Sequence, residues 1–219
     1  MSKVELPPSV LDCLKNEMQI KMDYFFDKYN NFDDGFKVEA NEIMSKLLKD
    51  TKTLTTFDSS YHVYQHTDSE KCQFIQSMSE CFECLNKHTG IELKKIIFSH
   101  GSRGGNAWFP VVEILYPLAD YSNQPEELVL YRGCFISEFN SEQYWQSWTF
   151  DFDTAKAFAF THFSNINEQE RVVIKARVKN TDIVWIRTGE SEVVLSLSFK
   201  PLSIEVEMDY NKYCKSKNP

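Results

Sequence analysis

Hydrophobic residues in the first hundred positions recur at steps of three and four, the spacing that places side chains on one face of an α-helix. This pattern predicts helices over about 9–25, 38–49 and 69–87. Pro7-Pro8-Ser9 is a helix start, because proline fits the first turn and serine can cap it. Asp33-Asp34-Gly35 predicts a turn, and Gly90 marks the end of the third helix.

The texture changes after Pro125, where apolar and polar residues begin to alternate with the period of two that is typical of strands. Strands are expected over about 127–131, 171–178, 182–186, 192–197 and 202–207, with a helix over 153–162. The type of 93–98 and of 108–118 is left open. The chain is therefore expected to have an α+β fold, with a helical region over 1–100 and a second region over 101–219 that together form one compact unit.

Composition narrows the class of protein. The 219 residues include 17 Phe, 10 Tyr and 4 Trp, enough apolar surface to exclude a disordered chain. The net charge of −8 argues against general electrostatic binding to nucleic acid or to an anionic membrane. No apolar run approaches the roughly 20 residues of a membrane span, and no signal peptide pattern opens the chain. We expect a cytoplasmic protein, of the producing cell or of a target cell, that does not engage a membrane.

The cysteines raise the question of a metal site. Cys81 and Cys84 are separated by two residues, and His88 lies one helical turn further on, with Cys72 nearby. Against zinc, these residues lie within a helical pattern and no second Cys-x-x-Cys follows. Small buried thiols explain them equally well. Zinc stays open at these residues, although no metal is expected.

Three short elements of the second half could carry chemistry. Arg132-Gly133 ends an apolar strand, and it offers a planar fork suited to phosphate beside a residue without Cβ that a flat ligand can approach. Ser147-Trp148-Thr149 places two hydroxyls on one face of a strand. Glu190-Ser191-Glu192 places two carboxylates on one side, and carboxylates beside a sugar stabilise an oxocarbenium-like transition state. Taken singly, each element is also compatible with an ordinary surface or strand role.

The ordered set of Arg, Ser-x-Thr and Glu-x-Glu resembles the mono-ADP-ribosyltransferases of the Arg-Ser-Glu class, which include bacterial toxins, phage enzymes and arginine-specific ectoenzymes. The resemblance covers about 127–208. It implies a split antiparallel β-core of ADP-ribosyltransferase type that binds NAD as a substrate, preceded by a helical segment. Trp148 departs from the Ser or Thr that often stands at the middle position, but the first and third positions are retained.

The resemblance also implies roles for single residues. Glu192 would bind the 2′-hydroxyl of the nicotinamide ribose and stabilise the oxocarbenium, and Glu190 would polarise the acceptor. Ser147 would position Glu192, and Thr149 would line the ribose pocket. Arg132 would hold a phosphate of NAD.

Further contacts are expected from the backbone and from loops. Gly133 would bind the nicotinamide amide through its backbone, and Phe163 is the candidate aromatic residue near the nicotinamide. The segment 182–189 would be a substrate-recognition loop that exposes Trp185 or Arg187.

These expectations lead to an NAD-dependent ADP-ribosyltransferase that modifies a macromolecule. Glu190 favours arginine of a protein as the acceptor, because in the family Glu at this position accompanies arginine acceptors. RNA or DNA is the runner-up. A non-catalytic module that binds a nucleotide or a partner protein is the alternative of a different class. A toxin, an injected effector, a phage enzyme or a defence enzyme would fit, and a toxin could have a neutralising antitoxin or immunity partner.

Overall fold

The computed structural model describes residues 4–49, 70–100, 111–162 and 167–217. These residues form an α+β structure in which the strands belong to one six-stranded antiparallel sheet. The chain divides into two compact units, Met1–Glu113 and Ile114–Pro219. In the described part, no helix has the length and apolar character needed to cross a membrane.

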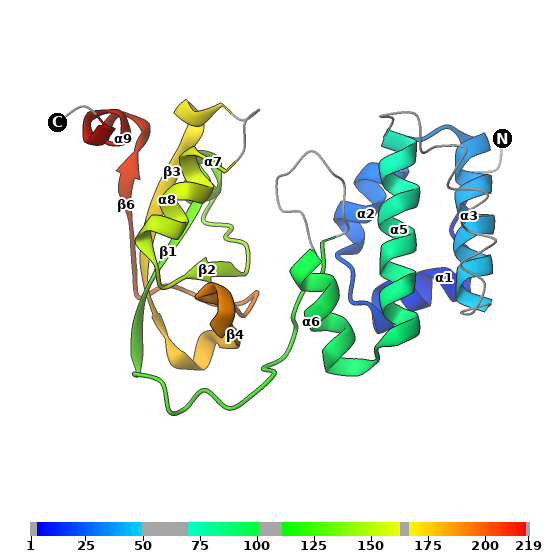
Figure 1. The fold of residues 1–219 in the computed structure, drawn as a ribbon, viewed down its shortest axis with the longest axis horizontal. Coiled ribbons are helices and arrows are strands. Elements are labelled where there is room, and N and C mark those ends of the chain that lie inside the picture. The colour runs from blue at the N-terminus through cyan, green and yellow to red at the C-terminus, as the bar shows by residue number, and fades with distance from the viewer. Residues whose placement is uncertain (1–3, 50–69, 101–110, 163–166, 218–219) are drawn as a thin grey trace. The chain divides into compact units, whose positions relative to one another are not determined.

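The first unit is helical (Figure 1). Its elements are α1 (Pro8–Asp12), the π-helix η1 (Cys13–Glu17), α2 (Met22–Tyr29), α3 (Asp34–Lys49), α5 (Glu70–Lys87) and α6 (Gly90–His100). The predicted helices over 38–49 and 69–87 are confirmed, and the open segment 93–98 is part of α6. Asp33 caps α3, because its carboxylate accepts a hydrogen bond from the Phe36 amide at 2.9 Å.

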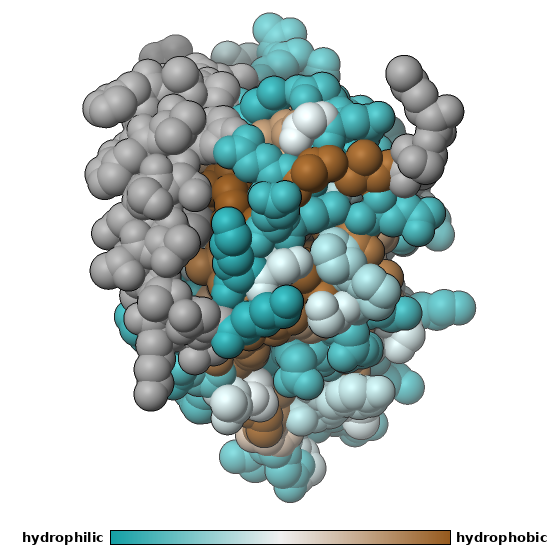
Figure 2. All heavy atoms as spheres, turned by 90° about the vertical axis from the view of Figure 1, so that its right-hand side faces the viewer, coloured by the Kyte–Doolittle hydropathy of each residue, from teal (hydrophilic) through white to brown (hydrophobic). Residues whose placement is uncertain are grey.

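Aromatic side chains fill the core of this helical unit. Phe25, Tyr29 and Phe74 are fully buried, and the ring centroids of Phe25 and Phe74 lie 5.8 Å apart. On the face of the unit seen in Figure 2, polar side chains cover much of the described surface and hydrophobic ones lie between them in smaller groups.

The predicted continuous helix over 9–25 is wrong, because the chain leaves the helical conformation after η1. Gln19 has a left-handed backbone with φ of 55°. Ile20 then forms an isolated antiparallel bridge with Val112, and the Lys21 amide donates to the Val111 carbonyl at 2.8 Å. A partner from far along the sequence thus interrupts a helix that the local pattern favours.

The second unit contains the sheet (Figure 1). The strand order is β4-β5-β2-β1-β3-β6. Its strands are β1 (Glu127–Phe135), β2 (Ser147–Thr149), β3 (Arg171–Lys179), β4 (Ile183–Arg187), β5 (Glu192–Leu195) and β6 (Ser203–Asp209). Its helices are α7 (Ile136–Ser141), α8 (Phe152–Phe160) and α9 (Tyr210–Lys217), with short 3-10 turns η2 (Glu168–Glu170), η3 (Asn180–Asp182) and η4 (Thr188–Glu190).

The two halves of the sheet meet at a narrow join. Strands β1 and β3 pair over their whole length, from Glu127 opposite Lys179 to Phe135 opposite Arg171. By contrast, in the described residues β1 and β2 are in register only at Tyr131 opposite Thr149. The backbones of the halves β4-β5-β2 and β1-β3-β6 therefore pair at one position, while the larger hydrophobic cluster packs side chains from both halves together.

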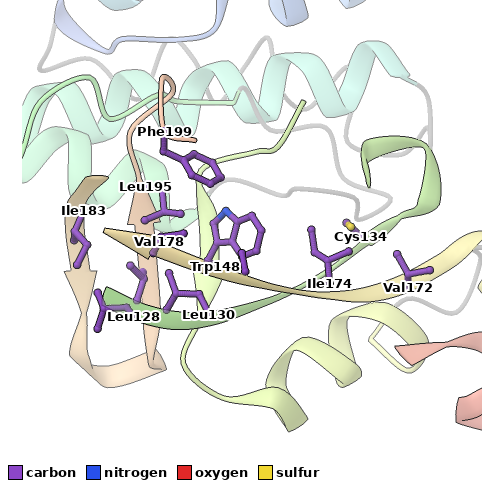
Figure 3. Packing of buried hydrophobic residues seen from close by; sticks show 12 residues of the cluster. Leu128, Leu130, Cys134, Trp148, Val172, Ile174, Val178, Ile183, Leu195 and Phe199 are labelled. Carbon is purple, nitrogen blue, oxygen red and sulfur yellow. The ribbon is translucent and has the colours of Figure 1, made fainter. Parts of the chain in front are cut away.

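The sheet has two covered faces, because side chains alternate along each strand. One face carries the larger hydrophobic cluster, in which Trp148 packs edge-to-face against Phe199 with ring centroids 5.7 Å apart (Figure 3). The other face packs against α8 through a smaller cluster that includes Ala155, Ala159 and Val173. We call these the Trp148 face and the α8 face.

Candidate functional site

Three neighbouring strands of the sheet bring the sequence elements together. The Nη1 of Arg132 on β1 donates to the carbonyl of Ser147 on β2 at 2.6 Å. The hydroxyl of Ser147 in turn donates to Oε1 of Glu192, the first residue of β5. The fold therefore places the expected positioning serine in direct contact with the expected catalytic carboxylate, although they are far apart in sequence.

Both carboxylate oxygens of Glu192 are bonded. Oε1 accepts from Ser147, and Oε2 accepts from Nη1 of Arg187 at 3.3 Å. Arg187 ends β4 and stands directly opposite Glu192 in the β4–β5 register. Glu192 is held from two sides and is largely shielded from water.

The residue before Glu192 has a backbone conformation that residues other than glycine rarely adopt. Ser191 has a left-handed backbone with φ of 52°. Its carbonyl accepts from the Thr149 hydroxyl at 3.0 Å and from the Phe150 amide at 3.2 Å. The Thr149 hydroxyl also accepts from the Asp151 amide at 3.1 Å. Hydrogen bonds from the end of β2 thus fix the turn that aims Glu192.

Arg132 is committed to partners within the protein. Its Nε and Nη2 donate to the two carboxylate oxygens of Glu138, at 2.7 and 3.2 Å. Glu138 lies on α7 and also accepts from the Trp145 amide at 3.0 Å. With the bond to the Ser147 carbonyl, three of the five guanidinium N–H groups that an arginine carries are occupied.

Strand alternation separates Arg132 from the carboxylate site. Tyr131 and Thr149 stand opposite each other, and Thr149 stands opposite Glu192, so these side chains share the α8 face. Ser147 lies two residues before Thr149 and shares that face as well. Arg132 follows Tyr131 directly and therefore projects to the Trp148 face. Its guanidinium reaches β2 at a backbone carbonyl, not on the side where Glu192 lies.

Gly133 makes room for a helix. A Cβ at this position would lie 2.2 Å from the Ala155 carbonyl oxygen and 2.6 Å from the Ala159 amide nitrogen. The close approach that the missing Cβ allows is therefore that of α8, where a flat ligand was expected. The Gly133 carbonyl accepts a long bond from Arg171 at 3.5 Å.

Two charged residues of this region have no signal in the sequence motifs. Glu138 is the partner of Arg132, but nothing in its sequence neighbourhood indicates that pairing. Arg171 is buried and donates to the carbonyls of Phe158 and Ala159 at 2.8 and 3.3 Å, where it compensates the C-terminal end of α8. Burial lowers the pKa of Arg171. The one sequence signal for a buried Arg171 is its place at the start of the apolar strand β3.

The segment 182–189, which the resemblance implies to be a recognition loop, consists largely of the strand that the sequence pattern predicts over 182–186. Ile183–Arg187 forms β4, and Trp185 is only 9% exposed, so this segment does not present Trp185 to a partner. The reason is that the run Ile-Val-Trp-Ile has no polar position, which suits a strand covered on both faces. Phe163 and the side chain of Glu190 lie outside the described residues.

The thiols of the described residues are not arranged as a metal site. Among the residues that the structure describes, no group of three or more His, Cys, Asp or Glu side chains could hold a metal ion. Cys81 lies fully buried on α5, and burial raises its pKa well above the usual range. Cys134, two residues after Arg132, is also buried, and desolvation raises its pKa to about 12. Neither thiol is poised as a nucleophile.

Comparisons of the chain with protein-family models, with curated proteins and with solved structures gave no match.

Proposed function

We propose that the protein is an NAD-dependent mono-ADP-ribosyltransferase that transfers ADP-ribose to a macromolecular acceptor, with arginine of a protein as the favoured acceptor. The observation that carries the proposal is the hydrogen bond from the Ser147 hydroxyl to Glu192. It links two of the three sequence elements through their side chains, and the third contacts the Ser147 backbone. Three weak signals that meet in space are far more specific than any one of them.

The chemistry requires a carboxylate whose interaction with the substrate strengthens during the reaction. As the bond between the ribose C1′ and nicotinamide breaks, positive charge develops on the ribose, and nicotinamide leaves as a neutral molecule. Glu192, fixed by Ser147, would accept a hydrogen bond from the 2′-hydroxyl and stabilise the positive charge on the ribose. The acceptor nitrogen then bonds to C1′ and gives up a proton, for which Glu190 is the proposed base.

The sheet supports an ADP-ribosyltransferase type of core. Its halves are in register at Tyr131 and Thr149 alone among the described residues, which suits the split core that the resemblance implies. The site elements lie on β1, β2 and β5, the strands on either side of this join. Arg132 has a different role in this proposal. It is a positioning residue that links Glu138 to the Ser147 backbone and so supports the serine that holds Glu192.

The decisive experiment incubates the purified protein with NAD labelled in the adenylate part and a cell lysate. Glu192→Ala is the test variant. Glu205→Ala is the control, since Glu205 lies on β6 and pairs with Lys175. We expect label on macromolecules with wild type and Glu205→Ala, and none with Glu192→Ala. Label that persists in the folded Glu192→Ala protein, or no label and no free nicotinamide with wild type, would contradict the proposal.

Digestion of the labelled material identifies the acceptor. Protease-sensitive label supports a protein acceptor. The stability of the bond between ADP-ribose and the acceptor in hydroxylamine is then compared with that of an ADP-ribosyl-arginine standard, with mass spectrometry as the readout. Nuclease-sensitive label would replace the protein acceptor with RNA or DNA. Glu190→Ala should lose transfer and retain NAD hydrolysis, and an equal loss of both would remove its proposed role on the acceptor side.

One observation favours a second candidate, a non-catalytic module that binds a nucleotide or a partner protein. Arg132, which the family resemblance assigns to NAD phosphate, is paired with Glu138. A non-catalytic module would release no nicotinamide from NAD, whether or not it binds NAD, and nicotinamide release would then be the same in Glu192→Ala as in wild type.

If the enzyme is a toxin, intact genes should be difficult to clone without a neutralising partner, whereas the Glu192→Ala gene should clone readily.

A further inference from the structure

We propose that Arg187 is the residue that receives the phosphate next to the nicotinamide ribose, and that this phosphate displaces Glu192 from Arg187 when NAD binds. The inference rests on the proposed function and deepens it. In the free protein, Arg187 holds the carboxylate. In the complex, the same guanidinium would hold phosphate, and Glu192 would become available to the ribose hydroxyl.

The first argument is position. Arg187 stands directly opposite Glu192 in the β4–β5 register, so the two side chains lie on the same face of the sheet. Ser147, two residues before the Thr149 that stands opposite Glu192, shares this face. In NAD, the phosphate is attached to C5′ of the same ribose whose 2′-hydroxyl Glu192 would accept. A cation beside Glu192 is therefore placed to meet that phosphate.

The second argument is that Arg132 is not placed for this task. It projects to the Trp148 face, and its Nε and Nη2 already donate to the carboxylate of Glu138 at 2.7 and 3.2 Å. A phosphate at Arg132 would have to displace a nearby carboxylate and would be repelled by it. Its side chain is 13% exposed, whereas that of Arg187 is 26% exposed.

The third argument is the exchange itself. The contact from Arg187 Nη1 to Glu192 Oε2 is 3.3 Å, longer than the strongest charge-assisted hydrogen bonds. A phosphate carries its own negative charge and can take a guanidinium bidentately, so it is a strong competitor for Arg187. The exchange costs no unpaired charge, because the ribose hydroxyl replaces Arg187 at Oε2 while Ser147 stays at Oε1. Binding of the substrate thereby frees the carboxylate that acts on it.

The test uses ADP as the probe, because ADP carries the diphosphate without the nicotinamide ribose. Calorimetric titration of the full chain with ADP is compared for wild type, Arg187→Gln and Arg187→Lys. The control is Arg177→Gln, an arginine of β3 that pairs with Glu127 at the surface. We expect Arg187→Gln to weaken ADP binding by about tenfold or more, Arg187→Lys to weaken it less, and Arg177→Gln to leave it unchanged.

Glu192→Ala gives the sharper result, because the exchange predicts a change in the opposite direction. This variant removes the carboxylate that competes with phosphate for Arg187, so it should bind ADP more tightly than wild type does. A merely structural role of Arg187 would not produce this gain. Equal ADP affinity of wild type, Arg187→Gln and Glu192→Ala would overturn the exchange. It would also be overturned if Arg132→Lys weakened ADP binding and Arg187→Gln did not.

Kinetics separates the failure of this inference from failure of the proposed function. If Arg187 binds phosphate, Arg187→Gln should raise KM for NAD in nicotinamide release and retain most of kcat. A fall in kcat with unchanged KM would mean that Arg187 only positions Glu192, which leaves the transferase intact and overturns the exchange. A wild-type protein that neither binds ADP nor releases nicotinamide would overturn the proposed function and, with it, the exchange. Circular dichroism of each variant shows whether it is folded.

Discussion

The ion pairs of the helical unit and of the sheet unit differ in how far they are exposed to water. In the helical unit, ion pairs such as Lys71–Asp33, where the side chains are 39% and 62% exposed, and Lys95–Glu92, with 32% and 65%, lie in water, and the buried Lys37 pairs with Asp34, which is 59% exposed. In the sheet unit, the pairs Arg132–Glu138 and Arg187–Glu192 are largely shielded. The remaining pairs of the described sheet unit, such as Arg177–Glu127, are exposed like those of the helical unit.

This difference indicates where the molecule is specialised. Moving an ion pair out of water is costly and is weak evidence for stability, because hydrophobic residues of the same volume often serve as well. Two such pairs within the four adjacent strands β4-β5-β2-β1 are therefore better explained by a function that needs oriented charges. In the described helical unit, aromatic residues lie inside, and each ion pair keeps at least one side chain that is 35% exposed or more.

The largest effect should come from breaking a shielded pair. Glu138→Ala leaves the Arg132 guanidinium without its carboxylate partner, and we expect a loss of about 3 kcal/mol in the free energy of unfolding. The corresponding change in the helical unit, Glu83→Ala, removes the surface partner of Lys87 and should have little effect. Denaturation followed by tryptophan fluorescence and by circular dichroism measures both variants, since Trp145, Trp148 and Trp185 belong to the sheet unit and Trp108 to the helical unit.

A double variant separates the stability of this pair from its use. Arg132→Met with Glu138→Leu replaces both charges by apolar side chains and should recover much of the lost stability. It also removes the bond to the Ser147 carbonyl, so NAD turnover should stay low. A single Glu138→Ala variant as stable as Glu83→Ala would contradict the contrast between the two units.

The sequence predicts the regular elements better than the charges that join them. The alternation over 171–178 identifies β3, and helical spacing identifies α3 and α5, because these patterns depend on neighbours in the chain. The break at Gln19 depends on Val112, and the partner of Arg132 is set by how α7 follows β1. Contacts of this kind are chosen by the tertiary fold, which local periodicity does not contain.

The candidate site shows the same division. The motif residues Ser147 and Glu192 were predicted as partners and are bonded to each other. The resemblance implied a loop that exposes Trp185 or Arg187. Trp185 is buried and Arg187 is partly exposed, because this apolar run forms the strand that the sequence pattern predicts over 182–186. The part played by Gly133 could be found only when α8 was in place.

The second prediction concerns close packing. Gly133→Ala adds a Cβ 2.2 Å from the Ala155 carbonyl oxygen, so α8 must move, at a cost of about 1 to 3 kcal/mol in the free energy of unfolding. In the helical unit, Gly35→Ala meets only the Asp33 side chain, at 3.2 Å. That change also gains the helix preference of alanine in α3 and should leave stability nearly unchanged. Urea denaturation of both variants measures the difference, and a Gly133→Ala protein as stable as wild type would show that α8 is not held close to β1.

The third prediction compares one strained residue in each unit. Ser191 and Gln19 both have a left-handed backbone, with φ of 52° and 55°. Glycine accepts this conformation, so Ser191→Gly and Gln19→Gly should each stabilise the folded chain by up to about 1 kcal/mol, after the larger entropy of the unfolded chain is subtracted. Only Ser191→Gly should lower NAD hydrolysis, because it loosens the turn that aims Glu192. Nicotinamide release that is equally affected in both variants would remove the special role of the turn.

The smallest effect concerns acid, where the two units should behave alike. Asp33 caps α3, and the hydrogen bond from Lys71, together with the Phe36 amide, lowers its pKa below the ordinary 3.8. Asp151 caps α8, and the Asp153 amide and the Thr154 hydroxyl lower its pKa in the same way. Because each carboxyl has a lower pKa when folded, its contribution to stability is fully present above the unfolded value. The contribution is lost as the pH falls below 3.8 through the folded pKa.

Asparagine keeps a capping oxygen at every pH, so Asp33→Asn and Asp151→Asn should each make the stability of their own unit depend less on pH in acid. Hydrogen exchange of α3 and α8 between pH 5 and about pH 3 measures this. Unchanged acid sensitivity of α8 in Asp151→Asn would mean that other carboxyl groups of the sheet unit, and not this cap, set its response to acid.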